Sequence, residues 1–216
     1  MSGFRNRLEE YLASGSQPTA IEQLTPDAST REYFRIIREG ESAIACVYPE
    51  EPAGIAQFEA CLDVTSVFLD AGLPVARILA SDLKKLIIIH EDFGDSILRD
   101  EMLASDVKTR ENLLDETIRL IAKIQKGTDI SFQKESISSR LKFDKEKLLW
   151  ELDFFKTNYF GSLMKTVLSE RESEELESEF IDVASELENR ATVLCHRDFH
   201  AANLMVHNGS LKIIDH

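Results

Sequence analysis

Apolar and polar positions in the first part of the chain predict a helix, two pairs of strands and a second helix. Residues 1–15 carry apolar side chains at helical spacing, which predicts an amphipathic helix; they are Phe4, Leu8, Tyr11 and Leu12. Two β-rich runs, residues 33–38 and 42–48, flank Glu39-Gly40-Glu41 and predict a hairpin. A helical stripe over residues 54–71 then ends at Gly72, with Pro74 beyond it.

The next apolar runs predict two further strands, at residues 76–80 and 86–90. The order helix, two strands, helix, two strands is typical of a small antiparallel sheet with a helix packed against it. Residues 91–95 (Glu-Asp-Phe-Gly-Asp) are predicted to form a linker that leaves this sheet.

Helical patterns dominate from residue 96 to about residue 190, including a strong stripe over residues 107–126. The acidic stretch at residues 170–179 is interpreted as a solvated helix face. A short strand is predicted at residues 192–195. Two more strands, at residues 204–206 and 211–214, flank His207-Asn208-Gly209-Ser210, and an Asn-Gly pair between apolar runs predicts a hairpin.

Composition and net charge indicate which class of protein this is and which partners are disfavoured. The 216 residues are 43% hydrophobic, enough for an ordinary buried core. A formal charge of -14 disfavours nucleic acid and anionic membranes as partners. Cys46, Cys61 and Cys195 form no C-x-x-C pair and are expected to be core or near-core thiols in a reducing compartment. With no secretory signal and no membrane-spanning run, we expect a cytoplasmic protein; the sequence does not indicate an oligomeric state.

The candidate chemistry lies near the end of the chain, in the pattern H-x-D-x-x-x-x-N. Phosphoryl transfer needs an acceptor hydroxyl held in line and a divalent metal to neutralise phosphate charge. Asp198 would orient and deprotonate the hydroxyl, and Asn203 and Asp215 would bind Mg²⁺ through side-chain oxygens. The predicted hairpin would bring these two ligands to the same edge.

Each of these residues also has an alternative interpretation. One His, one Asp and one Asn fall at this spacing by accident in about one chain in a hundred of this length. The strand before the loop, the hairpin after it and the Asp that closes the second strand favour the functional interpretation. His196 is expected to fix the loop through a hydrogen bond to backbone rather than to act as an acid or base. His200 could either contact a phosphate or pack.

The segment from Cys195 to Asp215 resembles the catalytic loop and metal-binding strand of the aminoglycoside phosphotransferase family, which has a bilobal, protein-kinase-like fold. His200 stands where protein kinases usually carry Lys and this family usually carries His. Arg197, in place of the family's common Gly, resembles the branch of cell-wall amino-sugar kinases that act on N-acetylmuramate and N-acetylglucosamine. Residues 27–35 (DASTREYFR) resemble that branch's D-A-S-x-R-x-Y-F-R segment, in the place of the phosphate-covering loop.

The resemblance implies an α+β fold with an N-terminal nucleotide-binding lobe at residues 1–92 and a mainly helical C-terminal lobe at residues 93–216. Ala28, Ser29 and Thr30 are small enough for their backbone N–H groups to approach phosphates, although the same residues would suit an ordinary polar turn. Backbone groups near Glu91 and Phe93 would hold adenine. The letters Asp92-Phe93-Gly94 are not the metal motif, because they precede the catalytic loop.

Two features depart from the family pattern. A kinase expects a Lys in the strand at residues 43–48, and none is present, so Glu59 on the next helix could equally be a solvent-facing residue. The family's C-terminal lobe normally continues well past the metal-binding Asp, whereas this chain ends at His216. We therefore expect a fragment or truncated product, which on its own could bind nucleotide without turning over substrate.

The resulting hypothesis is a small-molecule kinase that uses ATP or GTP with Mg²⁺ to phosphorylate a hydroxyl of a sugar or amino sugar. A kinase for another small alcohol, such as an aminoglycoside, choline or homoserine, remains open. So does a catalytically inactive, kinase-like binding module, which the missing Lys would favour and the intact Asp198, Asn203 and Asp215 would oppose.

Overall fold

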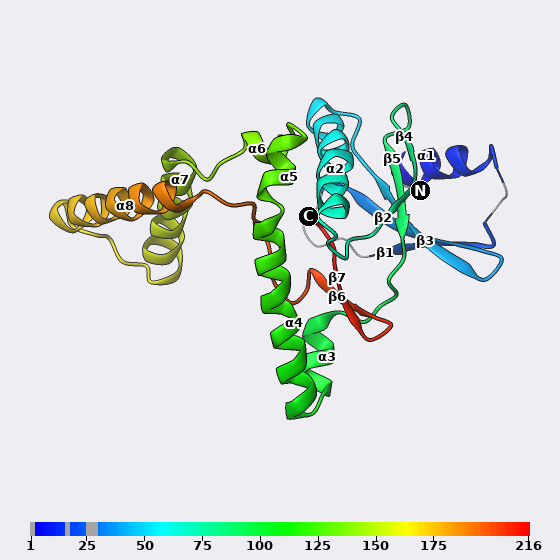
Figure 1. Ribbon diagram of the computed structural model, residues 1–216. Helices are drawn as coiled ribbons and strands as arrows, with labels where there is room; N and C mark the ends of the chain where they lie inside the picture. Colours follow the sequence, from blue (N-terminus) through cyan, green and yellow to red (C-terminus); the bar gives the residue numbers. More distant parts are fainter. Residues whose placement is uncertain (1–2, 16–17, 25–29) are drawn as a thin grey trace. The chain divides into compact units, whose positions relative to one another are not determined.

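A five-stranded antiparallel sheet forms the first part of the chain. The computed structural model describes residues 3–15, 18–24 and 30–216 (Figure 1). The strands are β1 (Ala20–Leu24), β2 (Glu32–Arg38), β3 (Glu41–Val47), β4 (Ile78–Asp82) and β5 (Ile87–Glu91), in the order β1-β2-β3-β5-β4. Four of these strands confirm the predictions, and β1 is an additional edge strand.

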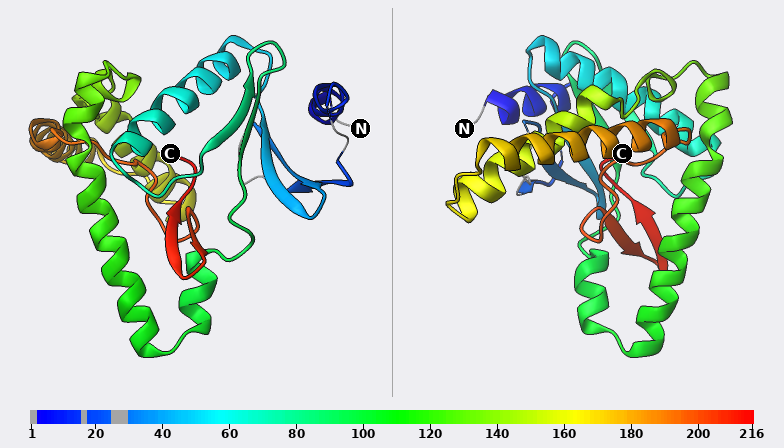
Figure 2. Two further views of the ribbon diagram at one scale, coloured as in Figure 1. Left: turned by 45° about the vertical axis from the view of Figure 1, so that its right-hand side comes forward. Right: turned by 90° about the vertical axis from the view of Figure 1, so that its left-hand side faces the viewer.

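Alternating side chains give this sheet two apolar faces, each covered by one helix (Figure 2). Helix α1 (Gly3–Leu12) packs Leu8 and Leu12 against the face that carries Phe34, Ala45 and Ile87. Helix α2 (Pro52–Asp70) packs Phe58 against the opposite face, which carries Cys46, Tyr48 and Ile88. The register explains the division, because successive residues of a strand point to opposite faces. The second face is the one that leads to the candidate site.

The hairpin of β6 (Leu204–His207) and β7 (Ser210–Ile213) forms a second, two-stranded sheet, as predicted. Asn208 and Gly209 make its turn with φ values of 51° and 72°, the left-handed conformation that a two-residue hairpin loop requires. The hairpin packs with α4 (Val107–Lys126) and the end of α2 around one buried core, formed by Val67, Phe68, Leu73, Val75, Leu98, Leu120, Ile124, Leu194, Leu204, Leu211 and Ile213. Short helices α3 (Leu98–Ala104) and α5 (Thr128–Gln133) precede and follow α4.

The chain divides into two compact units, residues 1–137 with 194–216, and residues 138–193. The second unit contains most of α6 (Ile137–Arg140), then α7 (Lys145–Lys156), a π-helical segment η1 (Thr157–Leu163) and α8 (Glu170–Arg190). Helices α7 and α8 run antiparallel, because Lys156 at the end of α7 bonds Glu177 in the first half of α8 and Lys145 at the start of α7 bonds Glu188 near the end of α8. This division differs from the predicted lobes at 1–92 and 93–216, which stay a prediction.

Residues 192–195 form no strand, so that prediction is wrong. The backbone N–H of Leu194 donates instead to the Thr128 hydroxyl at 2.9 Å, and the Leu194 side chain enters the core around α4. This backbone donor is therefore satisfied by a side chain rather than by a neighbouring strand. Cys46 is buried and Cys61 half-buried, as expected, but Cys195 is exposed.

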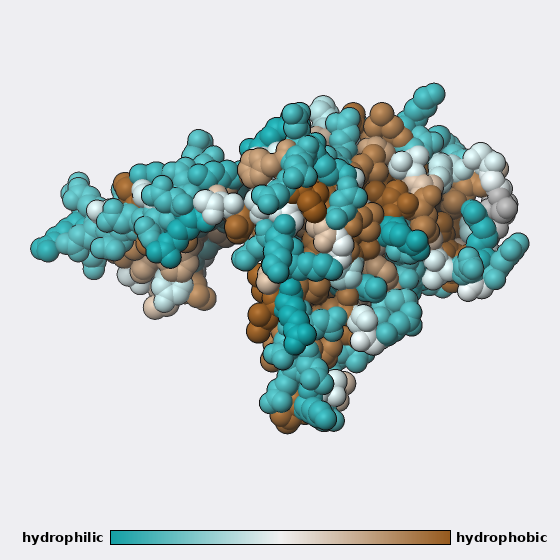
Figure 3. All heavy atoms as spheres, viewed as in Figure 1, coloured by the Kyte–Doolittle hydropathy of each residue, from teal (hydrophilic) through white to brown (hydrophobic). Residues whose placement is uncertain are grey.

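Helix α4 keeps an apolar stripe on its outer side, visible as brown surface along the helix (Figure 3). Leu114 is 47% exposed and Ile118 is 63% exposed. None of the helices in the described part of the chain combines the length and the apolar character needed to cross a membrane.

Candidate active site

The loop at residues 196–203 brings Asp198 and Asn203 together. The Asn203 amide nitrogen donates to both the backbone oxygen and the carboxylate Oδ2 of Asp198, each at 3.1 Å. The backbone N–H of Asn203 bonds the His200 carbonyl at 2.9 Å and closes the turn. Since Asn203 bonds Asp198 through its nitrogen, its amide oxygen is left as the atom able to bind a cation.

Asp215 comes to the same loop through its neighbour Ile214. The backbone N–H of Ile214 donates to the Asn203 carbonyl at 3.1 Å, and the Ile214 carbonyl accepts from His196 Nε2 at 3.1 Å. Asp215 has a φ of 54°, and Arg197 in the facing loop has a φ of 71°. Left-handed backbone at a non-glycine residue costs about 1 kcal/mol or more, and such strain gathers at functional sites.

His196 is a buried loop anchor. Its side chain is 8% exposed, and its ring lies 6.4 Å from the ring of Phe68 and 5.7 Å from that of Phe199. Burial lowers the pKa of His196, which keeps the ring neutral with its proton on Nε2 for the Ile214 carbonyl. This geometry agrees with the predicted structural role.

His200 lies beside the Asp198 carboxylate rather than in the core. Its Nδ1 accepts from the Ala202 N–H at 3.2 Å, so the ring proton sits on Nε2, which is 3.3 Å from Asp198 Oδ1. Both side chains are more than half exposed, at 52% and 65%. The arrangement orients the carboxylate without burying it.

Asp215 and Asn203 offer the oxygen donors that magnesium prefers. Among residues 3–15, 18–24 and 30–216 there is no group of three or more His, Cys, Asp or Glu side chains arranged to hold a metal. Mg²⁺ typically uses one or two carboxylates and completes its shell with phosphate oxygens and water. The Asp215 carboxylate, 42% exposed, and the Asn203 amide oxygen are oxygen donors of that kind.

Three of the residues predicted to bind nucleotide, Thr30, Glu91 and Phe93, lie in the described part of the chain. Ala28 and Ser29 lie outside the described residues, and Thr30 is exposed, with its hydroxyl 3.5 Å from Gln57 Oε1 of α2. The Glu91 carboxylate pairs with Arg77, whose hydrogen bond lowers the Glu91 pKa. The Phe93 carbonyl accepts from His207 Nδ1 at 3.0 Å, so this linker is tied to the β6–β7 hairpin.

Glu59 is exposed on α2, which agrees with the solvent-facing alternative. The strand where a kinase expects its Lys is β3, whose sequence ESAIACV holds no cation. Cys46 occupies the inward position on that strand, opposite Tyr33 of β2.

Two arginines that the sequence interpretation did not single out reach the site region. Arg31 Nη2 lies 2.7 Å from Asp215 Oδ1, and Arg35 bonds Asp92 through Nε at 2.6 Å. Both belong to the segment at residues 27–35, and strand alternation places them on one sheet face with Tyr33. That alternation is the sequence signal that could have indicated them.

His216 was also not predicted. Its ring stacks on Phe68 of α2 with centroids 5.0 Å apart, and its Nε2 is 2.9 Å from the Thr65 hydroxyl. Burial lowers the His216 pKa to about 4, so this ring is neutral near pH 7. His216 therefore ties the segment after β7, which carries Asp215, to α2.

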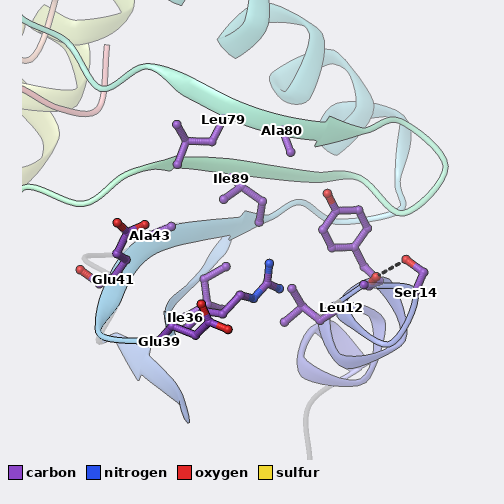
Figure 4. Close-up of a pocket in the computed structure, with 13 residues that line it drawn as sticks. Leu12, Ser14, Ile36, Glu39, Glu41, Ala43, Leu79, Ala80 and Ile89 are labelled. Carbon is purple, nitrogen blue, oxygen red and sulfur yellow. Dashed lines mark hydrogen bonds between the residues drawn. The ribbon is translucent and has the colours of Figure 1, made fainter. Parts of the chain in front are cut away.

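A cavity of about 600 Å³ lies on the other side of the sheet (Figure 4). The close-up shows Leu12 of α1 and Ser14, just after this helix, across from Ile36, Ala43 and Ile89 of the strands. Asp198, Asn203 and Asp215 are not among its lining residues. The cavity and the candidate site are therefore separate features.

Comparison with known proteins identifies the fold. The solved structure of a phosphotransferase, the streptomycin–ATP–APH(2″)-IIa ternary complex, matches all of this chain with a TM-score of 0.69 and 16% identity. A choline kinase from Streptococcus pneumoniae, LicA, matches 99% of the chain with a TM-score of 0.61 and 13% identity. The chain spans 71% and 68% of those two proteins. Among curated protein sequences there is no significant match.

A spectinomycin phosphotransferase, APH(9)-Ia, solved with ADP and spectinomycin, aligns with 97% of the chain at 15% identity and a TM-score of 0.59. These likenesses confirm the predicted α+β, kinase-like fold. The sequence profile of the APH family, described as the phosphotransferase enzyme family, matches residues 20–215. Because this match covers most of the chain, the protein belongs to the phosphotransferase enzyme family and is a small-molecule kinase of that family.

Proposed function

We propose that this protein transfers the γ-phosphoryl group of ATP, with Mg²⁺, to a hydroxyl group of a sugar or amino sugar. The observation that carries the proposal is the link between Asp198 and Asn203, together with the bond from Ile214 that brings Asp215 beside them. Such a set would hold an acceptor hydroxyl and a metal close together, which is most of what phosphoryl transfer requires.

The proposed step begins with the acceptor hydroxyl hydrogen-bonded to the Asp198 carboxylate. As the hydroxyl oxygen forms its bond to the γ-phosphorus, its proton moves to Asp198, and the bond from the γ-phosphorus to the bridging oxygen breaks with its electron pair left on ADP. His200 Nε2 keeps the carboxylate oriented. Bound Mg²⁺ would neutralise phosphate charge, with Asp215 and Asn203 holding it in place.

His196 would preserve this geometry without entering the reaction. It joins the start of the loop to the Ile214 carbonyl, one residue from Asp215. A neutral, buried ring keeps this hydrogen bond unchanged over the neutral pH range.

The acceptor assignment rests on two sequence features. Residues 27–35 and Arg197 both resemble the branch of kinases that act on N-acetylmuramate and N-acetylglucosamine. The solved structures above name aminoglycosides and choline instead, and an acidic chain of charge -14 would attract cationic acceptors over long range. Net charge describes the whole surface rather than one site, so we retain the amino sugar as the proposed acceptor.

An acceptor panel tests this proposal. Phosphate transfer would be measured from ATP and from GTP to N-acetylmuramate, N-acetylglucosamine, kanamycin, choline and homoserine. We expect transfer to an amino sugar, reduced by about a hundredfold or more in Asp198→Asn, since a general base typically contributes that much. Transfer to choline or kanamycin but to neither amino sugar would reject the acceptor assignment. Transfer unaffected by Asp198→Asn would reject the proposed roles.

A further inference from the structure

Strand β3 supplies no positive charge to the nucleotide side of the site. Its inward residue Cys46 is 1% exposed, and burial raises the pKa of the thiol to about 12, so it is neutral near pH 7. Kinases nonetheless use a protein cation, normally a lysine, that contacts the nucleotide phosphates in addition to Mg²⁺. In this protein such a cation has to come from another element.

Arg31 brings a guanidinium to the same face of the sheet. It precedes β2, and the β2–β3 register places Tyr33 opposite Cys46, so Arg31 lies diagonally beside Cys46. The guanidinium carbon is 5.6 Å from the centre of the Tyr33 ring and 5.9 Å from that of Tyr48. The rings of Tyr33 on β2 and of Tyr48, directly after β3, thus flank a planar cation where β3 has only a thiol.

The charge of Arg31 reaches three separate parts of the site. Its Nη2 lies 2.7 Å from Oδ1 of Asp215, which is two residues beyond the end of β7. Burial is the main influence on the pKa of Cys46 in β3 and of His90 in β5, and the Arg31 charge is the next one at each. The guanidinium therefore lies beside Tyr33, Tyr48 and the candidate metal-binding residue Asp215.

We propose that Arg31 is the phosphate-contacting cation of this kinase and takes the place of the lysine missing from β3. This inference rests on the proposed function. A guanidinium presents forked N–H donors that match phosphate oxygens and stays charged at all physiological pH values. Its bond to Asp215 keeps the cation beside the carboxylate that would hold Mg²⁺, and hence beside the phosphates that the same ion bridges.

Nucleotides that differ in their phosphates test the proposal. Dissociation constants for ATP, ADP and adenosine would be measured calorimetrically with Mg²⁺ for the wild-type chain, Arg31→Met and the control Arg5→Met. Arg5 is a matched control because it is an arginine of similar exposure that lies on α1, where it pairs with Glu9 at 2.9 Å and 33% of its side chain is exposed. We expect Arg31→Met to weaken ATP and ADP about tenfold or more and adenosine less than about twofold, with no change in Arg5→Met.

Arg31→Gln provides a second variant, because it keeps a hydrogen-bond donor for Asp215 while removing the charge. We expect Arg31→Gln to lose affinity for ATP and ADP but not for adenosine, and to unfold at a temperature close to that of the wild type. Equal losses of affinity for ATP and adenosine, or unchanged ATP affinity in folded variants, would overturn the proposed role of Arg31 and leave the proposed function standing. Failure of the wild-type protein to bind either ATP or ADP with Mg²⁺ would overturn the proposed function as well.

Discussion

Replacing Arg35 with alanine should destabilise the protein far more than replacing Arg77, although both arginines pair with a carboxylate beside the linker. Arg35 bonds Asp92 through Nε at 2.6 Å and through Nη2 at 3.2 Å, and the Asp92 side chain is only 3% exposed. Arg35 also bonds Asp95 Oδ1 at 2.8 Å and the Gly94 carbonyl at 3.0 Å. Arg77, by contrast, is 69% exposed.

The expected magnitudes follow from this difference in burial. Arg35→Ala leaves the buried Asp92 carboxylate with a hydrogen bond from the Gly94 N–H but without its cation, which should cost about 3 kcal/mol of unfolding free energy. Arg77→Ala removes an exposed ion pair and should cost less than about 1 kcal/mol. Urea unfolding of both variants and the wild type measures the two losses.

The pH dependence gives a second check on the same pair. Burial alone would raise the Asp92 pKa, but the hydrogen bonds from Arg35 and Gly94 outweigh it and hold the pKa below its ordinary value. A carboxylate with a lowered folded pKa stabilises the protein above its unfolded pKa of about 3.9 and loses that contribution as pH falls further. The difference between wild type and Arg35→Ala should therefore shrink below about pH 4. Equal losses for Arg35→Ala and Arg77→Ala near pH 7 would refute the reasoning.

Three other changes test the neighbouring structure. His196→Phe removes the donor to the Ile214 carbonyl and should lower the unfolding free energy, measured in urea, by about 1–3 kcal/mol. An unfolding free energy equal to that of the wild type would contradict this role of His196. Gly209→Ala, at a φ of 72°, should cost about 1 kcal/mol, and an unchanged melting temperature would count against the turn geometry. Burial lowers the pKa of His90 and of His216 from 6.5 to about 4, so each stays neutral in the folded protein while the unfolded chain gains its proton. Stability should fall as pH drops from 6.5 towards 4, by up to about 3 kcal/mol per histidine, and His90→Gln should reduce that fall.

Local patterns were enough to predict most of the elements. The β2–β3 hairpin and the Asn208-Gly209 turn depend on alternation and on turn chemistry, which are written in adjacent residues. Strand β1 was missed because its sequence AIEQL has little alternation and it pairs only at the sheet edge. Residues 192–195 were assigned to a strand because their short apolar run resembles one. The hydrogen bond from the Leu194 N–H to Thr128 joins residues far apart in sequence, so no local pattern indicates it.

The candidate site was predictable where its residues are close in sequence and not where they are distant. Asp198 and Asn203 share one loop, so their spacing alone indicates that they meet. Arg31 and Asp215 are 184 positions apart, and their ion pair depends on how the hairpin packs beside the sheet. Such contacts follow from tertiary packing, which no local pattern records.

The dependence of ATP affinity on Mg²⁺ in Asp215→Ala, compared with Asp198→Asn and the wild type, tests the central claim most directly. Asp215 is the proposed metal ligand, so its loss should weaken ATP binding in Mg²⁺ by about tenfold or more and reduce the effect of adding Mg²⁺. Asp198 is the proposed base and should change ATP affinity by less than about twofold. ATP affinity that is equal in Asp215→Ala and the wild type at every Mg²⁺ concentration would contradict the account.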